Sequence, residues 1–222
     1  MQNIENSLKN ILSEINSIEN TDGIPRIIAV SKKQSLTKIK ELYALGINEF
    51  GESFVQEAIE KINQLEINAT WHFIGNIQSN KTKLIAKHFD WVHSVSRYKT
   101  AERLNKQRIN LKPINVCVQV KIDQYDERES IDPNEVRDLL SSLKKFKNLT
   151  LRGLMGISLP TTPIEDRKNG FSKLYKLYSD LNSEGYKLDT LSMGMSEDYK
   201  IAIKNGSNMI RIGTVLFGER QK

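Results

Sequence analysis

Eight short strand-like runs alternate with helical segments along the chain, and this alternation constrains the fold more than any other feature. Strands separated by helices form parallel sheets through right-handed crossovers. Eight such units predict a closed (β/α)8 TIM barrel formed by residues 1–222 as a single domain, with an open doubly wound sheet as the alternative. The runs are Arg26–Val30, Asn48–Phe50, Thr70–Ile74, Trp91–Ser94, Ile114–Val120, Leu151–Met155, Thr190–Ser192 and Met209–Ile212.

Helical signals lie before and between these runs. Apolar residues at helical spacing predict an extra N-terminal helix ahead of the barrel, and they are Ile4, Leu8, Ile11, Leu12, Ile15 and Ile18. Ser35 is a candidate helix cap, Ser53–Gln56 and Asp132–Glu135 fit capping boxes, and Asn205-Gly206 is a stop signal.

Composition excludes several classes of protein. No window approaches the ~18 consecutive apolar residues that span a membrane, and the N-terminus lacks the pattern of a secretion signal. One cysteine, Cys117, excludes a disulfide framework and predicts a buried thiol in a reducing cytoplasm.

The net charge of +6 comes from basic residues interleaved with acids, so we expect no nucleic-acid partner. His72, His88 and His93 show no metal-ligand spacing, and we expect no metal.

Two small turns follow the last two runs, where such barrels often bind phosphate. "SMGMS" supplies Ser192, Gly194 and Ser196, and "RIGT" supplies Gly213 and Thr214. Turns of this kind present backbone N–H groups before a helix start, which favours an anion. Each turn alone could be only a tight connection with a serine cap, but the pair predicts a phosphate site.

Lysine and arginine add a second indication at the same rim. Lys32 follows the first run, where it could serve as a point charge or as an amine that forms a Schiff base. Arg211 interrupts the apolar run before Gly213, and a buried guanidinium needs a partner such as a pyridine nitrogen. Together with the phosphate turns, these residues indicate pyridoxal 5′-phosphate (PLP) as the cofactor.

Motifs over nearly the whole chain carry a family resemblance. They are "AVSK" at Ala29–Lys32, "FGES-VQEA" at Phe50–Ala58, "WHFIG-IQSNK" at Trp71–Lys81, "GLMGI" at Gly153–Ile157 and "LSMGMSEDY-AI--GS-MIRIGT-LFGER" at Leu191–Arg220. In these motifs the chain resembles the pyridoxal phosphate homeostasis protein family, which is related to the N-terminal barrel of alanine racemase.

The resemblance implies roles for individual residues. Lys32, not Lys33, would hold the cofactor as a Schiff base, and Arg211 would lie near the ring nitrogen. Phosphate contacts would come from Ser192, Met193, Gly194, Ser196, Gly213 and Thr214. Ser53, Asn76 and the segment 121–131 depart from the family pattern, which affects contacts around the cofactor more than its attachment.

We therefore expect a cytoplasmic carrier, buffer or regulator of PLP without substantial turnover, with PLP-dependent apoenzymes as candidate partners. Alanine racemases have a second domain that supplies a tyrosine base and the dimer contact, whereas eight residues follow Thr214 here, so a monomer is expected. A racemase-like PLP enzyme is the alternative. A barrel for a phosphorylated sugar or nucleotide, with Lys32 as a point charge, is the third reading.

Overall fold

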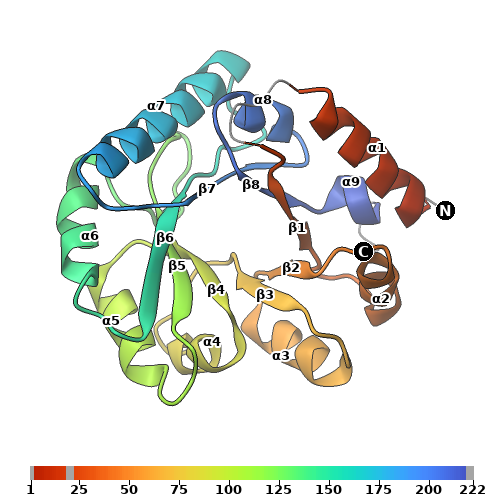
Figure 1. The fold of residues 1–222 in the computed structure, drawn as a ribbon, viewed down its shortest axis with the longest axis horizontal. Coiled ribbons are helices and arrows are strands. Elements are labelled where there is room, and N and C mark those ends of the chain that lie inside the picture. Colours follow the sequence, from red (N-terminus) through yellow and green to blue (C-terminus); the bar gives the residue numbers. More distant parts are fainter. Residues whose placement is uncertain (1–2, 19–22, 219–222) are drawn as a thin grey trace.

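The computed structural model describes residues 3–18 and 23–218, and it contains the predicted barrel (Figure 1). Eight parallel strands pair in sequence order, and β8 closes the ring against β1. They are β1 (Arg26–Val30), β2 (Glu49–Glu52), β3 (Thr70–Phe73), β4 (Trp91–Val95), β5 (Ile114–Gln119), β6 (Leu149–Met155), β7 (Thr190–Met195) and β8 (Met209–Ile212). The fold class predicted from the sequence is confirmed.

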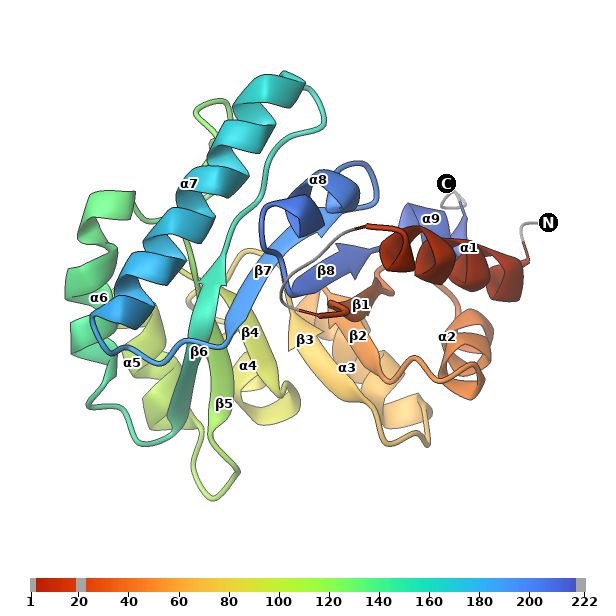
Figure 2. The ribbon, with the colours of Figure 1, turned by 45° about the horizontal axis from the view of Figure 1, so that its top comes forward.

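Helices form the outer layer of the barrel (Figures 1 and 2). They are α1 (Ile4–Asn16), α2 (Leu36–Ala44), α3 (Val55–Gln64), α4 (Thr82–His88), α5 (Tyr98–Gln107), α6 (Val136–Leu143), α7 (Ile164–Ser183), α8 (Tyr199–Lys204) and α9 (Thr214–Phe217), with a 3-10 turn, η1, at Pro133–Glu135. The expected N-terminal helix is α1, which packs on α2 and α9. No helix in the described part of the chain is long and apolar enough to cross a membrane.

The start signals were only partly correct. Ser35 accepts a hydrogen bond from the backbone N–H of Lys38 and caps α2, and Asp132 caps η1 through the N–H of Asn134. The predicted capping box at Ser53–Gln56 is wrong, because α3 begins after Phe54, which makes no side-chain cap bond. Strand β2 ends at Glu52 and the chain bends at Ser53, which lines the cavity at the rim of the barrel, so the cap position falls on Phe54.

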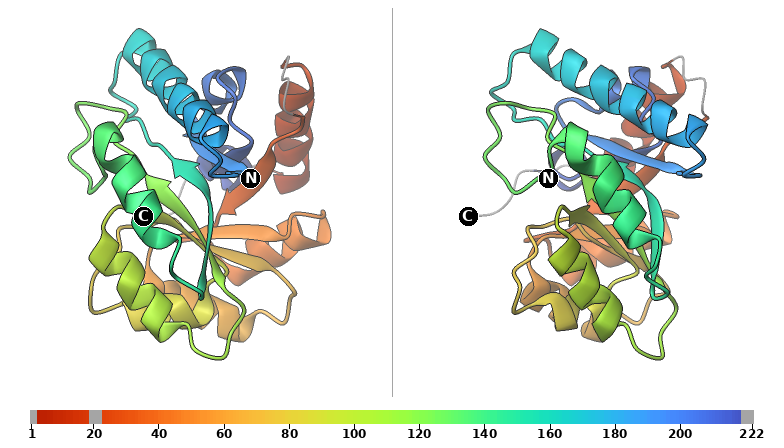
Figure 3. Two further views of the ribbon diagram at one scale, coloured as in Figure 1. Left: turned by 60° about the vertical axis from the view of Figure 1, so that its left-hand side comes forward. Right: turned by 90° about the vertical axis from the view of Figure 1, so that its left-hand side faces the viewer.

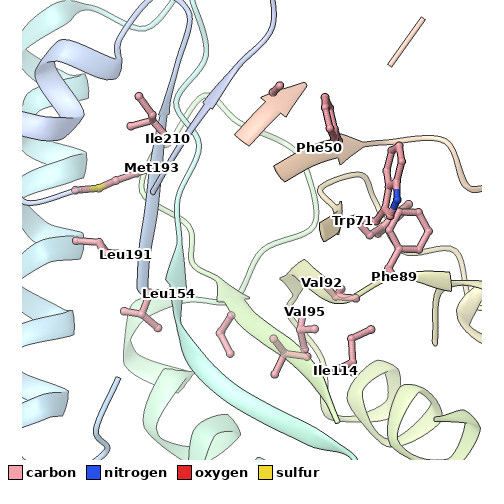
Figure 4. Packing of buried hydrophobic residues seen from close by; sticks show 14 of the residues in the cluster. Phe50, Trp71, Phe89, Val92, Val95, Ile114, Leu154, Leu191, Met193 and Ile210 are labelled. Carbon is pink, nitrogen blue, oxygen red and sulfur yellow. The ribbon is translucent and has the colours of Figure 1, made fainter. Parts of the chain in front are cut away.

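Apolar side chains form two layers, because residues alternate between the two faces of each strand. The larger layer lies between the strands and the helices and includes Phe50, Trp71, Leu191 and Met193 (Figure 4). A smaller cluster of inward-facing residues contains Ile28, Trp91, Cys117, Met155 and Met209. The thiol of Cys117 is buried as predicted, and burial raises its pKa to about 12.

Long connections follow β5 and β6 on the side of the barrel where those strands end. In Figure 3 the green segment after β5 lies near the first turns of α7 (cyan), and the rest of α7 runs along the outside of the barrel. Asp123 ties the two connections together by accepting hydrogen bonds from Ser158, from the N–H of Leu159 and from Thr162. These contacts shape one wall of the cavity described next.

Candidate functional site

A cavity of about 330 Å³ lies at the carboxyl ends of the strands. Its volume falls within the ~300–1,000 Å³ typical of small-molecule sites. This is also the face on which barrels of this kind place their chemistry. Its lining consists of Val30, Lys32, Ser53, Ile74, Arg128, Ile157, Ser158, Pro160, Met195, Ser196, Glu197, Asp198, Arg211, Gly213 and Thr214.

Lys32 lines this cavity directly after the end of β1. Arg26, Ile28 and Val30 alternate on the inward face of β1, and Lys32 continues that alternation past the strand end. Lys33 has a positive φ of 59°, and its side chain is exposed outside the cavity. The local backbone therefore separates the two lysines, and of the pair only Lys32 lines the cavity.

Arg211 reaches the same cavity from the inward face of β8, the strand paired with β1. Its side chain is buried, with 3% of the residue exposed. Nη1 donates to the hydroxyl of Ser192 at 2.6 Å, and Nη2 donates to the carbonyl of Gly156 at 2.9 Å. Burial lowers the pKa of Arg211 to about 10, so the guanidinium remains charged at neutral pH.

A chain of buried polar groups continues from Arg211 through the barrel interior. His93 Nδ1 lies 3.0 Å from Ser192 Oγ, and His93 Nε2 lies 3.0 Å from His72 Nδ1. His72 Nε2 in turn lies 3.4 Å from the carboxylate of Glu49, at the opposite end of the barrel. Burial lowers the pKa of both histidines, and the positive charge of Arg211 lowers the pKa of His93 further, so both rings are neutral at pH 7.

The histidines show how these polar groups are satisfied, with the exception of His72 Nε2, which has no hydrogen-bond partner. With the proton on Nε2 of each ring, His93 donates to His72 and accepts from the Ser192 hydroxyl, which leaves the Ser192 oxygen to accept from Arg211. The indole of Trp91 stacks on His72 with 5.4 Å between ring centroids. This chain fixes the direction of the Arg211 side chain from below the cavity.

The two turns predicted to bind phosphate lie side by side. Ser196 follows β7, Gly213 and Thr214 follow β8, and all three line the cavity. The N–H of Gly213 donates to Ser196 Oγ at 3.2 Å, which joins the turns directly. The carboxylate of Asp198, which also lines the cavity, accepts from the N–H of Met195, and burial raises the pKa of Asp198.

Three of the predicted phosphate contacts occupy different positions. Strand β7 continues to Met195, so Ser192, Met193 and Gly194 belong to the strand rather than to a turn, and none of them lines the cavity. Ser192 faces the interior and bonds to Arg211, whereas Met193 is buried in the outer apolar layer (Figure 4). Gly194 has a φ of +94°, and a Cβ there would lie 2.7 Å from the Cβ of Ala202.

Several residues of the site were not predicted from the sequence. Arg128 reaches the cavity from the segment 121–131, whose sequence departs from the family pattern, and its Nε bonds to Asp126. Ser158 enters from the connection after β6. Ser53 lines this cavity, whereas Asn76 lines a neighbouring one of about 390 Å³. The described residues contain no group of three or more potential metal ligands.

Known proteins of similar sequence and structure match nearly the whole chain. The family model of the alanine racemase N-terminal domain matches residues 7–221. Proteins named pyridoxal phosphate homeostasis protein are 41% identical in Pasteurella multocida, over 99% of this chain and 97% of that protein, and 42% identical in Haemophilus influenzae, over 98% and 93%. Motif residues 219–220 lie outside the described part of the structure.

Solved structures agree with these matches. PipY from Synechococcus elongatus, solved with PLP bound, is 34% identical and superposes with a TM-score of 0.86 over 97% of this chain and 100% of that one. An alanine racemase from Clostridium difficile shares the fold at 21% identity, with a TM-score of 0.75 over 98% of this chain and 58% of that one. The chain therefore belongs to the pyridoxal phosphate homeostasis protein family, within the wider family of the alanine racemase N-terminal domain.

Proposed function

We propose that this protein binds PLP in the cavity at the strand ends, attaches it to Lys32 as a Schiff base, and serves PLP homeostasis as a carrier, buffer or regulator. The observation that carries the proposal is that Lys32 and Arg211 line one cavity from paired strands, with the joined turns at Ser196 and Gly213 on the same rim.

The chemistry of the lining fits the three parts of PLP. The cofactor supplies an aldehyde, whose carbon would bond to the Lys32 amine with loss of water. The guanidinium of Arg211 offers a cation to the ring nitrogen, and the turns at Ser196, Gly213 and Thr214 suit a phosphate. The relatives support the same ligand, because they are named for PLP homeostasis and PipY was solved with PLP bound.

The lining also supports binding without turnover. Racemisation requires an acid and a base on opposite faces of the amino acid. Among the described residues, the lining contains no tyrosine or histidine, and its carboxylates are Glu197 and Asp198. Asp198 is buried and already accepts the N–H of Met195. A charged Arg211 beside the ring nitrogen disfavours a proton there, which would make the cofactor a poor stabiliser of carbanions.

Two other functions remain candidates for specific reasons. A racemase-like enzyme is favoured by the fold that the chain shares with alanine racemase. A phosphorylated sugar or nucleotide would also fit the turns, with Lys32 as a point charge. The proposed recipients of the cofactor are PLP-dependent apoenzymes.

Borohydride reduction tests the proposal. The purified protein with PLP should absorb as a Schiff base, and reduction followed by peptide mapping should place a pyridoxyl group on Lys32. Lys32→Ala should abolish the absorbance, while the matched variant Lys33→Ala should retain it. Label on Lys33, or no label with PLP held by the wild type, would contradict the attachment. If the protein does not bind PLP, a phosphorylated sugar or nucleotide becomes the favoured ligand.

A further inference from the structure

A buried ionic cluster lies on the outer side of the barrel directly behind Lys32. It contains Glu52 at the end of β2, together with Glu57 and Lys61 on α3, and it reaches the backbone at Ser31. None of these four residues lines the cavity. The cluster therefore needs a role other than direct contact with a ligand.

Lys61 uses its whole donor capacity in this cluster. Its Nζ donates to the carbonyl of Ser31 at 2.6 Å, to Oε1 of Glu52 at 2.8 Å and to Oε1 of Glu57 at 2.6 Å. An ammonium has three N–H donors, and all three have acceptors here. Only 8% of the Lys61 side chain is exposed. A buried charge is stable only with such partners, so the position of Nζ is closely specified.

The contacts of Lys61 and Glu57 include both peptide groups that flank Lys32. The carbonyl of Ser31 belongs to the peptide before Lys32, and it accepts from Lys61. The N–H of Lys33 belongs to the peptide after Lys32, and it donates to Oε1 of Glu57 at 2.5 Å. The ammonium and the carboxylate are also bonded to each other. One i,i+4 ion pair of α3 thus holds the backbone on each side of Lys32.

The backbone conformation at Lys33 is unfavourable by itself and is stabilised by a hydrogen bond. Lys33 adopts a φ of 59°, which is unfavourable for a residue with a Cβ. The bond from its N–H to Glu57 secures that conformation, which turns the exposed Lys33 away while Lys32 lines the cavity. Ser31 is fixed as well, since its Oγ donates to Glu52 at 2.6 Å and its N–H donates to the carbonyl of Gly51.

We propose that Lys61 and Glu57 are positioning residues, which fix both peptides beside Lys32 and so direct its amine toward the aldehyde of the bound cofactor. The inference deepens the proposed attachment of PLP to Lys32 and rests on it. A cluster that only fastened α3 to the barrel would stabilise the fold without any preference for a ligand that reacts with Lys32.

Two ligands separate these roles. PLP can bond to Lys32, whereas pyridoxine 5′-phosphate has the same ring and phosphate but carries an alcohol in place of the aldehyde. The ratio of their dissociation constants therefore isolates the contribution of the bond to Lys32 from that of the rest of the site. A reacting group that is misplaced by about 1 Å can react on the order of 100-fold more slowly.

The variants are Lys61→Met, Glu57→Leu and Glu57→Gln, with Glu60→Leu, an exposed neighbour on α3, as the matched control. In Lys61→Met and Glu57→Leu we expect the preference for PLP over pyridoxine 5′-phosphate to fall at least ~10-fold, with a weaker Schiff-base absorbance. Glu57→Gln retains an oxygen that can accept from the N–H of Lys33, so it should restore most of the preference. Glu60→Leu should match the wild type.

Each outcome decides the inference. An unchanged ratio in Glu57→Leu, or equal losses in Glu57→Leu and Glu60→Leu, would overturn it. A Glu57→Gln variant as impaired as Glu57→Leu would overturn it in favour of a charge effect. If Lys61→Met does not fold, Glu57→Leu still decides, because its side chain is 27% exposed. A wild-type protein with no preference for PLP would instead refute the proposed attachment itself.

Discussion

Arg211 and Ser192 are joined by a hydrogen bond of 2.6 Å between Nη1 and Oγ, on two strands that pair in the barrel. The same hydroxyl lies 3.0 Å from Nδ1 of His93. Ser192 thus connects the cation of the cavity to the polar interior of the barrel, and its hydroxyl leaves Arg211 little freedom to rotate.

Ser192→Ala should reorient Arg211 and destabilise the protein. Leaving a charged donor without its acceptor costs about 1–3 kcal/mol, because the guanidinium is buried. Denaturant unfolding measures the loss, and the absorbance of bound PLP reports the environment of its ring. Ser207→Ala is the control, since Ser207 is also buried and donates to the carbonyl of Met193 but does not contact Arg211. Equal spectral changes in both variants would contradict the role of Ser192.

Stability should fall as the pH falls below about 6.5, because His93 is held neutral in the folded protein. Burial depresses its folded pKa well below 6.5, so the unfolded chain binds more protons than the folded one in this range. The contribution is complete above the unfolded pKa and is lost as the pH falls toward the folded pKa, by up to ~1.4 kcal/mol per pH unit. His93→Gln should reduce the slope, measured by urea unfolding from pH 7.5 to 5. The partly exposed His88 provides the control, and an equal reduction in His88→Gln would argue against His93 as the source.

Gly194→Ala should destabilise β7 more than its backbone angle alone explains. A left-handed φ costs a residue with a Cβ about 1–2 kcal/mol, and crowding adds ~1–3 kcal/mol. Gly46→Ala separates the two effects, because Gly46 has a φ of +95° with nothing within 4 Å of a new Cβ, whereas Gly194 has 2.7 Å to Ala202. Thermal unfolding should show the larger loss for Gly194→Ala. Equal losses would mean that the strand shifts to accept the methyl group.

The phosphate should contribute much of the affinity for PLP. Hydrogen bonds to a charged group contribute about 1.5–3 kcal/mol each. Pyridoxal, which lacks the phosphate, should therefore bind at least ~10-fold more weakly than PLP in equilibrium titrations. In Ser196→Ala the difference in affinity between PLP and pyridoxal should be smaller. Equal affinities for pyridoxal and PLP would exclude the turns at Ser196 and Gly213 as the phosphate site.

Amino acids should not be turned over at an enzyme-like rate. The described lining offers no tyrosine or histidine opposite Lys32, and Arg211 disfavours a protonated ring nitrogen. Exchange of the α-hydrogen for deuterium, followed by NMR in the presence of the PLP-loaded protein, measures the reaction directly. A turnover number near the ~10 s⁻¹ of ordinary enzymes would favour the racemase-like alternative.

The sequence predicted the barrel well because its signals are local. Most of the strands contain a short apolar run, and the run at Arg26–Val30 matches β1 residue for residue. The length of β7 was underestimated, since Gly194 reads as a turn but lies inside a strand that continues to Met195. Glycine there serves close packing against α8 rather than a change of direction.

The residues of the site that the sequence predicted lie at or directly after the end of a strand. Lys32 and the turn at Gly213 could be placed at the rim from the ends of their strands, whereas the strand alone left open whether Arg211 faces the barrel interior or the helices. The contacts of Lys61 with the backbone at Ser31 could not be predicted, because the sequence of α3 does not indicate which of its polar residues faces inward. Arg128 was missed because its approach depends on the path of the connection after β5.

The pairing of β1 with β8 has a consequence for synthesis on the ribosome. Lys32 is synthesised well before Arg211, yet both belong to one cavity that exists only when the ring is closed. Until Met209–Ile212 has been made, β1 has no partner on that edge, and the lysine stands apart from the groups that would hold the rest of the ligand. Capture of the cofactor is therefore coupled to closure, and any ligand that binds only the closed ring stabilises the ring by an amount that grows with the ratio of its free concentration to its dissociation constant.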